Sequence, residues 1–338
     1  MKITVFGSGA WGTAVALLLC DNGHDVTLWS AHEEKAALLN ETRENPLLKG
    51  VVIPEGITIT SDGADAGKEA ELAVLAAPSF ACRETAGIMR DVLPESCEIV
   101  CISKGIEQGT SLRMSQMLEE VFGPGRKIAS LSGPSHAEEV SAKIPTGCVA
   151  ASKYRDTAMK VQDAFMNDYF RVYTSSDLVG VELGAALKNV IALCAGVCGG
   201  LGYGDNTIAM LVTRGLAEMA KLCVALGGRK ETLAGLAGLG DLIVTCTSRH
   251  SRNRRAGVYI GGGMPARAAM EKVGAVVEGY FAAKAAVQLA EKAGVDMPIC
   301  REAYHVLYEQ KEPRTAIREL MMRSKKSEEG GGESWVTE

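Results

Sequence analysis

The chain has 338 residues, of which 47% are hydrophobic and 23% charged, and its formal net charge is -5. A chain of this length is longer than usual for a domain with a single hydrophobic core, so we predict two domains. The composition is typical of a globular protein. The acidic balance argues against nucleic acid as a partner, so any basic site must be local. The ten cysteines form no Cys-x-x-Cys pair, which favours reduced core thiols over disulfides or a zinc site, and we expect no bound metal.

The start of the chain shows no secretory signal, because no apolar h-region with a small-residue cleavage site follows Lys2. Lys188, Arg214 and Lys221 interrupt the longest apolar runs before they reach the ~18 residues that a membrane helix needs. We therefore expect no membrane insertion and a cytoplasmic location.

Residues 2 to about 175 alternate short β-rich runs with helical stretches, which is typical of a parallel sheet with crossover helices. The clearest predicted strands are residues 2–6, 25–29, 71–77, 98–104 and 127–133. Their continuous apolar character indicates that helices cover both faces of the sheet. From about residue 177 the sequence changes to Ala-, Leu- and Gly-rich helical periodicity. These patterns predict an α/β domain over 1–176, an all-α domain over 177–323 and, from its charge and glycine content, a disordered tail over 324–338.

The first predicted strand is followed by GSGAWG, which places Gly7, Gly9 and Gly12 at the G-x-G-x-x-G spacing ahead of a helical run. A second strand ends near Trp29, so the whole unit has the length of about 30 residues that a dinucleotide-binding βαβ unit requires. The three glycines permit a tight turn, close approach of a pyrophosphate and close packing of helix on strand. The free N–H groups of the helix then face the anion. This context predicts a Rossmann-type dinucleotide site rather than a turn that merely needs glycine.

The end of the second strand bears on the choice of dinucleotide. Sites for NAD usually place Asp or Glu there, on the ribose 2′-hydroxyl. This chain has Ser30 and Ala31 at that point, then His32, and the acidic residues come slightly later. A small polar residue with a histidine tolerates a 2′-phosphate, whereas Glu33 opposes it. We predict that both NAD(H) and NADP(H) bind and leave the preference open.

Two later segments place polar residues at strand ends. Lys104 follows a predicted strand, where open α/β sheets bind ligands, although an exposed strand-end lysine is the simpler alternative. The sequence SGPSHAEEV, residues 132–140, places Gly133, Ser135 and Ala137 before a helix. Here the simpler alternative is helix entry with Ser135 as the N-cap.

The densest polar segment is GLGDLIVTCTSRHSRNRRAG, which carries Asp241 in a glycine-rich turn and then four arginines and a histidine within residues 249–255. Arginine forks suit a phosphate, and a helix that begins near Ser251 would place Arg252 and Asn253 at its anion-binding end. A nucleic-acid patch would interleave aromatic residues, which are absent from this segment. A solvated basic helix face is the other alternative.

The sequence GAALKNVIALCAG, residues 184–196, is apolar except for Lys188 and Asn189. Lysine is almost never buried without a partner, so Lys188 either extends to solvent or has a function. A dinucleotide site with a compact arginine cluster suggests a dehydrogenase for a small phosphorylated substrate, and hydride transfer needs an acid–base group. The histidines lie in no obvious catalytic setting. Lys188 is the remaining candidate, because desolvation lowers the pKa of a lysine.

The chain resembles, over nearly its whole length, the soluble, bacterial-type family of NAD(P)-dependent glycerol-3-phosphate dehydrogenases. The resemblance is carried by the ordered series GSGAWGTA, SKGIE, SGPSHAEE, ELGAALKNVIAL, GLGDLIVTCTSRHSRN and VVEGY. It implies a Rossmann-type N-terminal domain and a helical C-terminal domain like that of 6-phosphogluconate dehydrogenase. It further implies interconversion of sn-glycerol 3-phosphate with dihydroxyacetone phosphate, which supplies glycerophospholipid synthesis.

The resemblance also implies the roles of individual residues, with Lys188 as the proton acceptor. The implied substrate-binding residues are Lys104, Gly133, Ser135, Lys188, Asn189, Asp241, Ser251, Arg252 and Asn253. The implied cofactor-binding residues are Gly7, Gly9, Ala10, Trp11, Gly12, His32, Lys104, Ala137, Arg252, Val276 and Glu278. Two positions depart from the family pattern: Ala10 stands where many members have Ser or Asn, and Ala31 where a basic residue is frequent.

Two other functions stay open from the residues themselves. One is a related two-domain dehydrogenase for a 3-hydroxy acid or sugar acid, which would not need the arginine cluster. The other is a dinucleotide-sensing binding protein that keeps the fold without the chemistry. The oligomeric state is also open, with a homodimer as the candidate assembly.

Overall fold

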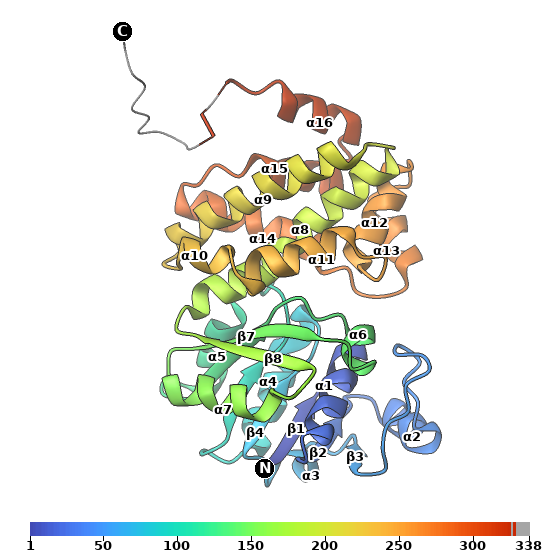
Figure 1. Ribbon diagram of the computed structural model, residues 1–338, viewed down its shortest axis with the longest axis vertical. Helices are drawn as coiled ribbons and strands as arrows, with labels where there is room; N and C mark the ends of the chain where they lie inside the picture. Colours follow the sequence, from blue (N-terminus) through green and yellow to red (C-terminus); the bar gives the residue numbers. More distant parts are fainter. Residues whose placement is uncertain (326, 329–338) are drawn as a thin grey trace.

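The computed structural model describes residues 1–325, 327 and 328. A sheet domain occupies the lower part of the molecule in Figure 1 and a helical domain the upper part. The tail predicted over 324–338 lies mostly outside the described residues. The sheet ends at Ser175 and the first helix of the upper domain begins at Leu178, so the predicted boundary at 176/177 falls within this link.

The sheet has eight strands in the order β3-β2-β1-β4-β5-β6-β7-β8. Their bounds are β1 (Lys2–Phe6), β2 (Asp25–Trp29), β3 (Ile57–Thr60), β4 (Leu72–Leu75), β5 (Glu98–Cys101), β6 (Ile128–Ser132), β7 (Thr146–Ser152) and β8 (Phe170–Ser175). The five predicted strands correspond to β1, β2, β4, β5 and β6. The prediction of a parallel sheet is wrong at one place, because β7 pairs antiparallel with β6, although β8 is again parallel to β7.

Helices cover both faces of the sheet, as the apolar strands predict. They are α1 (Ala10–Asp21), α2 (Glu33–Thr42), α3 (Gly63–Gly67), α4 (Cys82–Val92), α5 (Met114–Phe122), α6 (Ala137–Ser141) and α7 (Arg155–Phe165), with a 3-10 turn η1 (Ser79–Ala81) before α4. The neighbouring residues Val5 and Phe6 of β1 are both fully buried, yet they belong to two separate hydrophobic clusters. Successive strand residues point to opposite faces, so each face has its own core.

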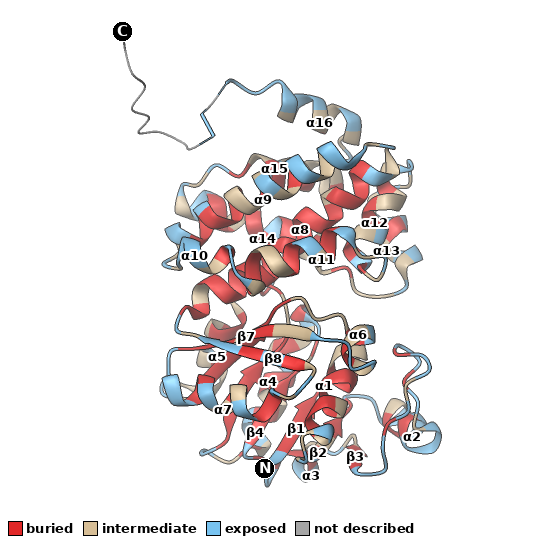
Figure 2. Ribbon diagram, viewed as in Figure 1, coloured by how far each residue is buried: buried red, intermediate tan, exposed pale blue. Residues whose placement is uncertain are grey.

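The upper domain is helical throughout its described residues, as expected. Its elements are α8 (Leu178–Gly200), α9 (Asp205–Ala225), α10 (Lys230–Leu233), the π-helical turn η2 (Leu236–Gly240), α11 (Asp241–Thr247), α12 (Arg252–Gly261), α13 (Ala266–Val273), α14 (Glu278–Ala293), α15 (Pro298–Tyr308) and α16 (Pro313–Met321). Helix α8 runs through the centre of this domain and is buried along most of its length (Figure 2). Contrary to our reading of the apolar runs, α8 is long and apolar enough for a membrane span. However, 89% of its most apolar window is buried inside the protein, as in a core helix.

Helix α12 packs very closely on α8. A Cβ added to Gly257 would lie 2.0 Å from the Leu193 carbonyl oxygen, and one added to Gly196 would lie 2.0 Å from the Arg254 carbonyl oxygen. Only glycine permits such an approach of two backbones. This packing fixes the position of the first turn of α12 relative to α8.

A buried ion pair joins α8 to the sheet domain. Glu182 accepts hydrogen bonds from the Ser115 backbone N–H and hydroxyl, both at 2.7 Å, and pairs with Arg113. Burial raises the pKa of Glu182, although Arg113 and Ser115 oppose that rise by stabilising the carboxylate. Removing one member of such a pair leaves an uncompensated buried charge, so these contacts fix α8 against the sheet.

Candidate functional site

The carboxyl ends of the parallel strands β1, β5 and β6 lie at the same edge of the sheet, the edge that faces the helical domain (Figure 1). Lys104 follows β5, and its Nζ donates hydrogen bonds to the Gly133 carbonyl oxygen at 2.8 Å and to the Ser135 hydroxyl at 3.3 Å. Both partners belong to the segment that follows β6. Lys104 is therefore held at the edge where open α/β sheets bind ligands and is not a free, exposed strand-end lysine.

Lys188 lies in the middle of α8 with 5% of its surface exposed, which excludes an extension to solvent. Its Nζ donates to Asp241 Oδ1 at 2.7 Å and to Thr245 Oγ1 at 2.7 Å. The other carboxylate oxygen, Asp241 Oδ2, accepts from Lys104 Nζ at 2.8 Å. One buried carboxylate therefore bridges a lysine of the sheet domain and a lysine of the helical domain.

The electrostatics of this bridge favour a titratable Lys188. Burial lowers the pKa of Lys188 to about 8, with Lys104 acting in the same direction and Asp241 opposing. Burial alone would raise the pKa of Asp241, but the two ammonium groups outweigh it and hold that pKa below its usual value. Asp241 stays ionised, while Lys188 can gain or lose a proton close to neutral pH.

Asp241 is the first residue of helix α11 and not part of an irregular turn, so our placement of it in a glycine-rich turn is wrong. The glycines before it form the π-helical turn η2, in which a Cβ on Gly238 would lie 2.2 Å from the Leu233 carbonyl oxygen. Thr245 is a site residue that we did not predict from the sequence. It follows Asp241 by four positions, a spacing that places both side chains on one face of a helix.

The start of α12 forms the other end of the site. Ser251 is its N-cap, and the Ser251 hydroxyl accepts a hydrogen bond from the Arg254 N–H at 3.2 Å. Arg252 is the first helical residue and is exposed. Within the described part of the chain its guanidinium has no hydrogen bond or ion pair. A free arginine at a helix N-terminus is a suitable anion site.

The side chains of Asn189 and Asn253 form a hydrogen bond with each other next to this anion site. Asn253 Nδ2 donates to Asn189 Oδ1 at 2.9 Å, and Asn253 Oδ1 accepts from the Gly279 N–H at 2.8 Å. Asn189 Nδ2 also reaches the Ala185 carbonyl oxygen at 3.4 Å. Both amides thus link α8, α12 and α14, and they support the predicted substrate site from inside.

The glycine loop after β1 has the geometry that the sequence predicts. Gly7 has φ of +130°, and a Cβ there would lie 2.7 Å from the Ala76 carbonyl oxygen, while a Cβ on Gly12 would lie 1.9 Å from the Gly7 carbonyl oxygen. Gly9, the N-cap of α1, has no atom within 4 Å of such a Cβ and faces open space. Trp11 lies in the first turn of α1 with a buried indole N–H that finds no partner among the described residues. This cradle fits a pyrophosphate on the N-terminus of α1.

Glu278 connects the helical domain to the cofactor edge of the sheet. It begins α14 and accepts hydrogen bonds from the Ser79 N–H at 3.1 Å and from the Ser79 hydroxyl at 2.5 Å. Burial raises the pKa of Glu278, and the bonds from Ser79 oppose this rise. Val276, two residues earlier, lines a cavity of about 400 Å³ together with Phe80 and Tyr280. Both predicted cofactor residues thus lie where the domains meet.

His136 is a second residue near the site that sequence reasoning missed. It is the N-cap residue of α6, so Ser135 is not the N-cap, and the predicted cofactor residue Ala137 is the first helical residue. The His136 Nε2 atom is buried without a partner among the described residues. Burial lowers the pKa of His136, and the charges of Lys188 and Lys104 lower it further. His136 directly follows Ser135, which accepts from Lys104 Nζ, so a histidine lies beside the lysine bridge, where we expected none.

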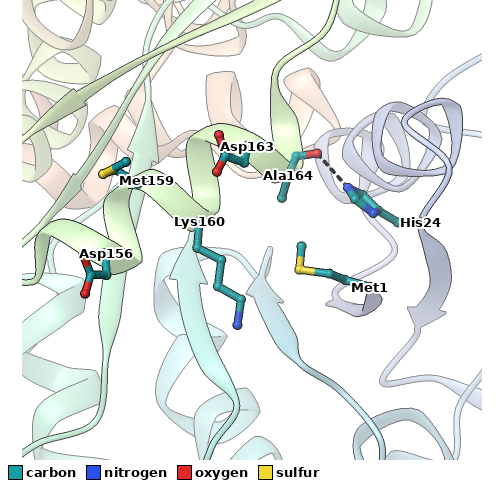
Figure 3. Close-up of a pocket in the computed structure, with 7 residues that line it drawn as sticks. All are labelled: Met1, His24, Asp156, Met159, Lys160, Asp163 and Ala164. Atoms are coloured by element: carbon teal, nitrogen blue, oxygen red, sulfur yellow. Dashed lines mark hydrogen bonds between the residues drawn. The ribbon is translucent and has the colours of Figure 1, made fainter.

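A separate cavity of about 490 Å³ lies at the opposite end of the sheet domain (Figure 3). It is lined by Met1 and His24, which precede β1 and β2, and by residues of α7 that include Asp156 and Lys160. His24 Nε2 lies 3.0 Å from the Ala164 carbonyl oxygen there. The amino ends of the strands carry none of the predicted site residues, so this cavity plays no part in the site.

A nucleotide cradle on a doubly wound sheet, faced by a buried lysine from a second, helical domain, defines a two-domain dinucleotide-dependent dehydrogenase. Family models agree with this class. Residues 2–158 match the N-terminal domain of NAD-dependent glycerol-3-phosphate dehydrogenase, and residues 177–318 match its C-terminal domain. The chain belongs to the NAD-dependent glycerol-3-phosphate dehydrogenase family.

Individual relatives agree with this assignment over the full length. The chain is 49% identical over 328 residues to a glycerol-3-phosphate dehydrogenase (NAD(P)+) of Agathobacter rectalis, with 97% of both chains covered. It is 50% identical over 331 residues to the enzyme of that name from Lysinibacillus sphaericus, covering 97% of this chain and 98% of the relative. A crystal structure of glycerol-3-phosphate dehydrogenase from Coxiella burnetii superimposes with a TM-score of 0.92 at 34% identity, covering 95% of this chain and 99% of that one.

Proposed function

We propose that Lys188 is the acid–base group of this NAD(P)-dependent oxidoreductase. The enzyme interconverts sn-glycerol 3-phosphate and dihydroxyacetone phosphate by hydride transfer, which supplies glycerol 3-phosphate for glycerophospholipid synthesis. The observation that carries the proposal is the buried bridge in which Asp241 holds Lys188 and Lys104 by bonds of 2.7 and 2.8 Å.

The hydrogen bonds of Lys188 leave one donor for the substrate. An ammonium has three N–H groups, and two are directed to Asp241 and Thr245. The third is available to the oxygen on C2 of the substrate. In reduction, Lys188 gives this proton to the carbonyl oxygen as the hydride arrives at carbon, and in oxidation the neutral amine takes the hydroxyl proton. A pKa of about 8 permits both directions near neutral pH.

Asp241 and Lys104 set the charge around that proton. The two ammonium groups and one carboxylate carry a net charge of +1 while Lys188 is protonated, which stabilises the partial negative charge that develops on the substrate oxygen. Asp241 also orients the Lys188 amine, because it fixes one N–H direction. Lys104 stays bonded to the Gly133 carbonyl oxygen and Ser135, and so keeps the carboxylate in place.

We assign the phosphate of the substrate to Arg252 and the first turn of α12. Arg252 is exposed and unpaired within the described chain, and the helix N-terminus adds backbone donors. Close packing of α12 on α8 fixes the distance between this anion site and Lys188. Binding energy from the non-reacting phosphate is thereby used to orient C2.

The cofactor supplies or accepts the hydride when bound. The glycine loop, Gly7 to Gly12, would hold its pyrophosphate, and Trp11 offers an unpartnered indole N–H beside it. We assign Glu278 and Val276 to the side of the cofactor site that the helical domain covers. The two hydrogen bonds from Ser79 to Glu278 link the domains on that side.

The assignment of the phosphate site is tested by comparing dihydroxyacetone phosphate with dihydroxyacetone as substrates for NADH and NADPH oxidation, followed at the nicotinamide absorbance. We expect turnover of the phosphorylated compound and little of the other. Equal rates, or faster reduction of a 3-oxo acid, would contradict the assignment and favour the hydroxy-acid alternative. Cofactor binding without any turnover would favour the dinucleotide-sensing protein.

We also propose that the enzyme works in the cytoplasm as a homodimer. Its ten cysteines are all free and most are buried, which suits a reducing compartment. Light scattering on the purified enzyme tests the assembly, with an expected mass of twice the 35.7 kDa of one chain.

A further inference from the structure

The end of β2 lacks the carboxylate that usually selects NAD. Ser30 directly follows β2, is 1% exposed, and accepts a hydrogen bond from the Ser8 hydroxyl at 2.9 Å. An Asp or Glu at this place would accept a hydrogen bond from the ribose 2′-hydroxyl and repel a 2′-phosphate. The nearby Glu33 and Glu34 are exposed in the first turn of α2, where they complement its dipole.

A lysine lies near the end of β2 in place of a carboxylate. Lys35, on α2, is half-buried, and its Nζ donates to the Ser8 carbonyl oxygen of the glycine loop at 2.7 Å. Within the described residues this is its one hydrogen bond, and no carboxylate lies within 4 Å of the ammonium. Two of its three N–H groups are therefore free to meet an incoming anion.

The burial of Lys35 makes an anionic partner favourable. Burial lowers the pKa of Lys35, since the charged form has lost water and has gained no counter-ion. A phosphate beside Lys35 would supply this counter-ion and accept charge-assisted hydrogen bonds from the free N–H groups. NADP differs from NAD by one phosphate, on the adenosine ribose, and that ribose lies beyond the end of the second strand in Rossmann-type sites.

We propose that Lys35 recognises the adenosine 2′-phosphate of NADP(H) and biases the enzyme toward the phosphorylated cofactor. The proposal rests on the glycine loop being the cofactor site, but not on the role of Lys188. It differs from the expectation for His32, which is the exposed N-cap residue of α2 and makes no capping bond. Lys35 is already held against the loop, so less of its freedom is lost when phosphate binds.

The alternative is that Lys35 merely fastens the glycine loop, and the structure offers a way to separate the two roles. The Ser8 carbonyl oxygen also accepts from Asn45 Nδ2 at 3.0 Å, and Asn45 is 1% exposed and bonded to Thr13 at 2.7 Å. The loop thus keeps a buried anchor when Lys35 is replaced. A substitution at Lys35 should leave the rest of the nucleotide site intact.

The experiment measures the binding of 2′,5′-ADP and 5′-AMP to the full-length enzyme by calorimetry. These fragments carry the adenosine of NADP and NAD and need no substrate, so failure of the catalytic assignment would not affect the result. We expect the wild type to prefer 2′,5′-ADP. Lys35→Met should weaken 2′,5′-ADP by roughly tenfold, the scale of a charged hydrogen bond, and leave 5′-AMP unchanged. Lys35→Arg should retain the preference.

The matched control is Lys68→Met, which removes the same charge from an exposed lysine paired with Asp65 elsewhere in the sheet domain. It should change neither affinity. If Lys35→Met weakens the binding of both fragments equally, Lys35 only holds the glycine loop in place and the proposal is wrong. A wild-type enzyme that binds 5′-AMP more tightly than 2′,5′-ADP would also overturn the proposal. Should the Met variant fail to fold, Lys35→Gln keeps a donor for Ser8 and is expected to lose the preference in the same way.

Discussion

Replacing Asp241 by Asn removes the negative charge from between two lysines and keeps a side chain of the same shape. In the folded enzyme Asp241 Oδ1 lies 2.7 Å from Lys188 Nζ and opposes the fall of the Lys188 pKa that burial causes. Its loss leaves the ammonium groups of Lys188 and Lys104 near each other without a counter-charge. The pKa of Lys188 must therefore fall below about 8 in the variant.

The size of this shift follows from the charges. Opposite unit charges about 4 Å apart interact by roughly 4 kcal/mol at an effective dielectric constant of about 20. One pKa unit corresponds to about 1.4 kcal/mol, so the full interaction is worth about 3 units. The Asn carbonyl oxygen still accepts a hydrogen bond and retains part of this stabilisation. We expect a net decrease of roughly 1 to 2 units.

The assay is the pH dependence of kcat/KM for reduction of dihydroxyacetone phosphate. Reduction needs protonated Lys188, so the rate should fall as pH rises through the pKa, near 8 in the wild type and at lower pH in Asp241→Asn. Asp65→Asn, at an exposed ion pair, serves as the control and should not move the profile. If kcat/KM falls at the same pH in the wild type and in Asp241→Asn, the coupling between Asp241 and Lys188 is refuted.

Two further predictions concern the anion site and a buried acid outside it. Arg252→Ala should raise the KM for dihydroxyacetone phosphate by roughly 10- to 100-fold with a smaller change in kcat, since a charged hydrogen bond contributes about 1.5–3 kcal/mol; an unchanged KM would remove Arg252 from the phosphate site. Glu218 of α9 accepts hydrogen bonds from the backbone N–H groups of Ile299 and Cys300, and burial raises its pKa from 4.5 to about 7. The folded state then holds the proton more tightly than the unfolded chain, so this group removes stability as pH rises from about 4.5 to 7, by roughly 3 kcal/mol. In urea unfolding, wild type should lose stability relative to Glu218→Gln across that range, and a constant difference would contradict the prediction.

Much of the fold could be predicted because its signals are local in the sequence. The glycine spacing defined the turn between β1 and α1, and the solid apolar strands indicated a sheet covered on both faces. The antiparallel β7 was not predicted, because its direction is decided by how the chain returns to the edge of the sheet and not by its own residues. The same limit applies to α8, whose composition resembles a membrane span until its packing is known.

Some of the site residues could likewise be predicted from local sequence, and others could not. Lys188 could be singled out because an ammonium in an apolar helix conflicts with burial, and that conflict is visible in the sequence alone. Its partner could not be identified, because Asp241 is 53 positions away and the pairing depends on how α11 packs on α8. Thr245 and His136 were missed for a related reason: each has an ordinary local setting and acquires its role from the neighbours that folding brings to it.

The central claim is that Lys188 moves the proton. The most direct test is kcat for dihydroxyacetone phosphate reduction by Lys188→Ala, measured beside NADH affinity, with Lys221→Ala on the exposed face of α9 as the matched control. We predict a loss in kcat of roughly 10³-fold, on the scale of a general acid, with NADH affinity and the control unchanged. A Lys188→Ala enzyme that binds NADH normally and keeps near-normal turnover would contradict the account.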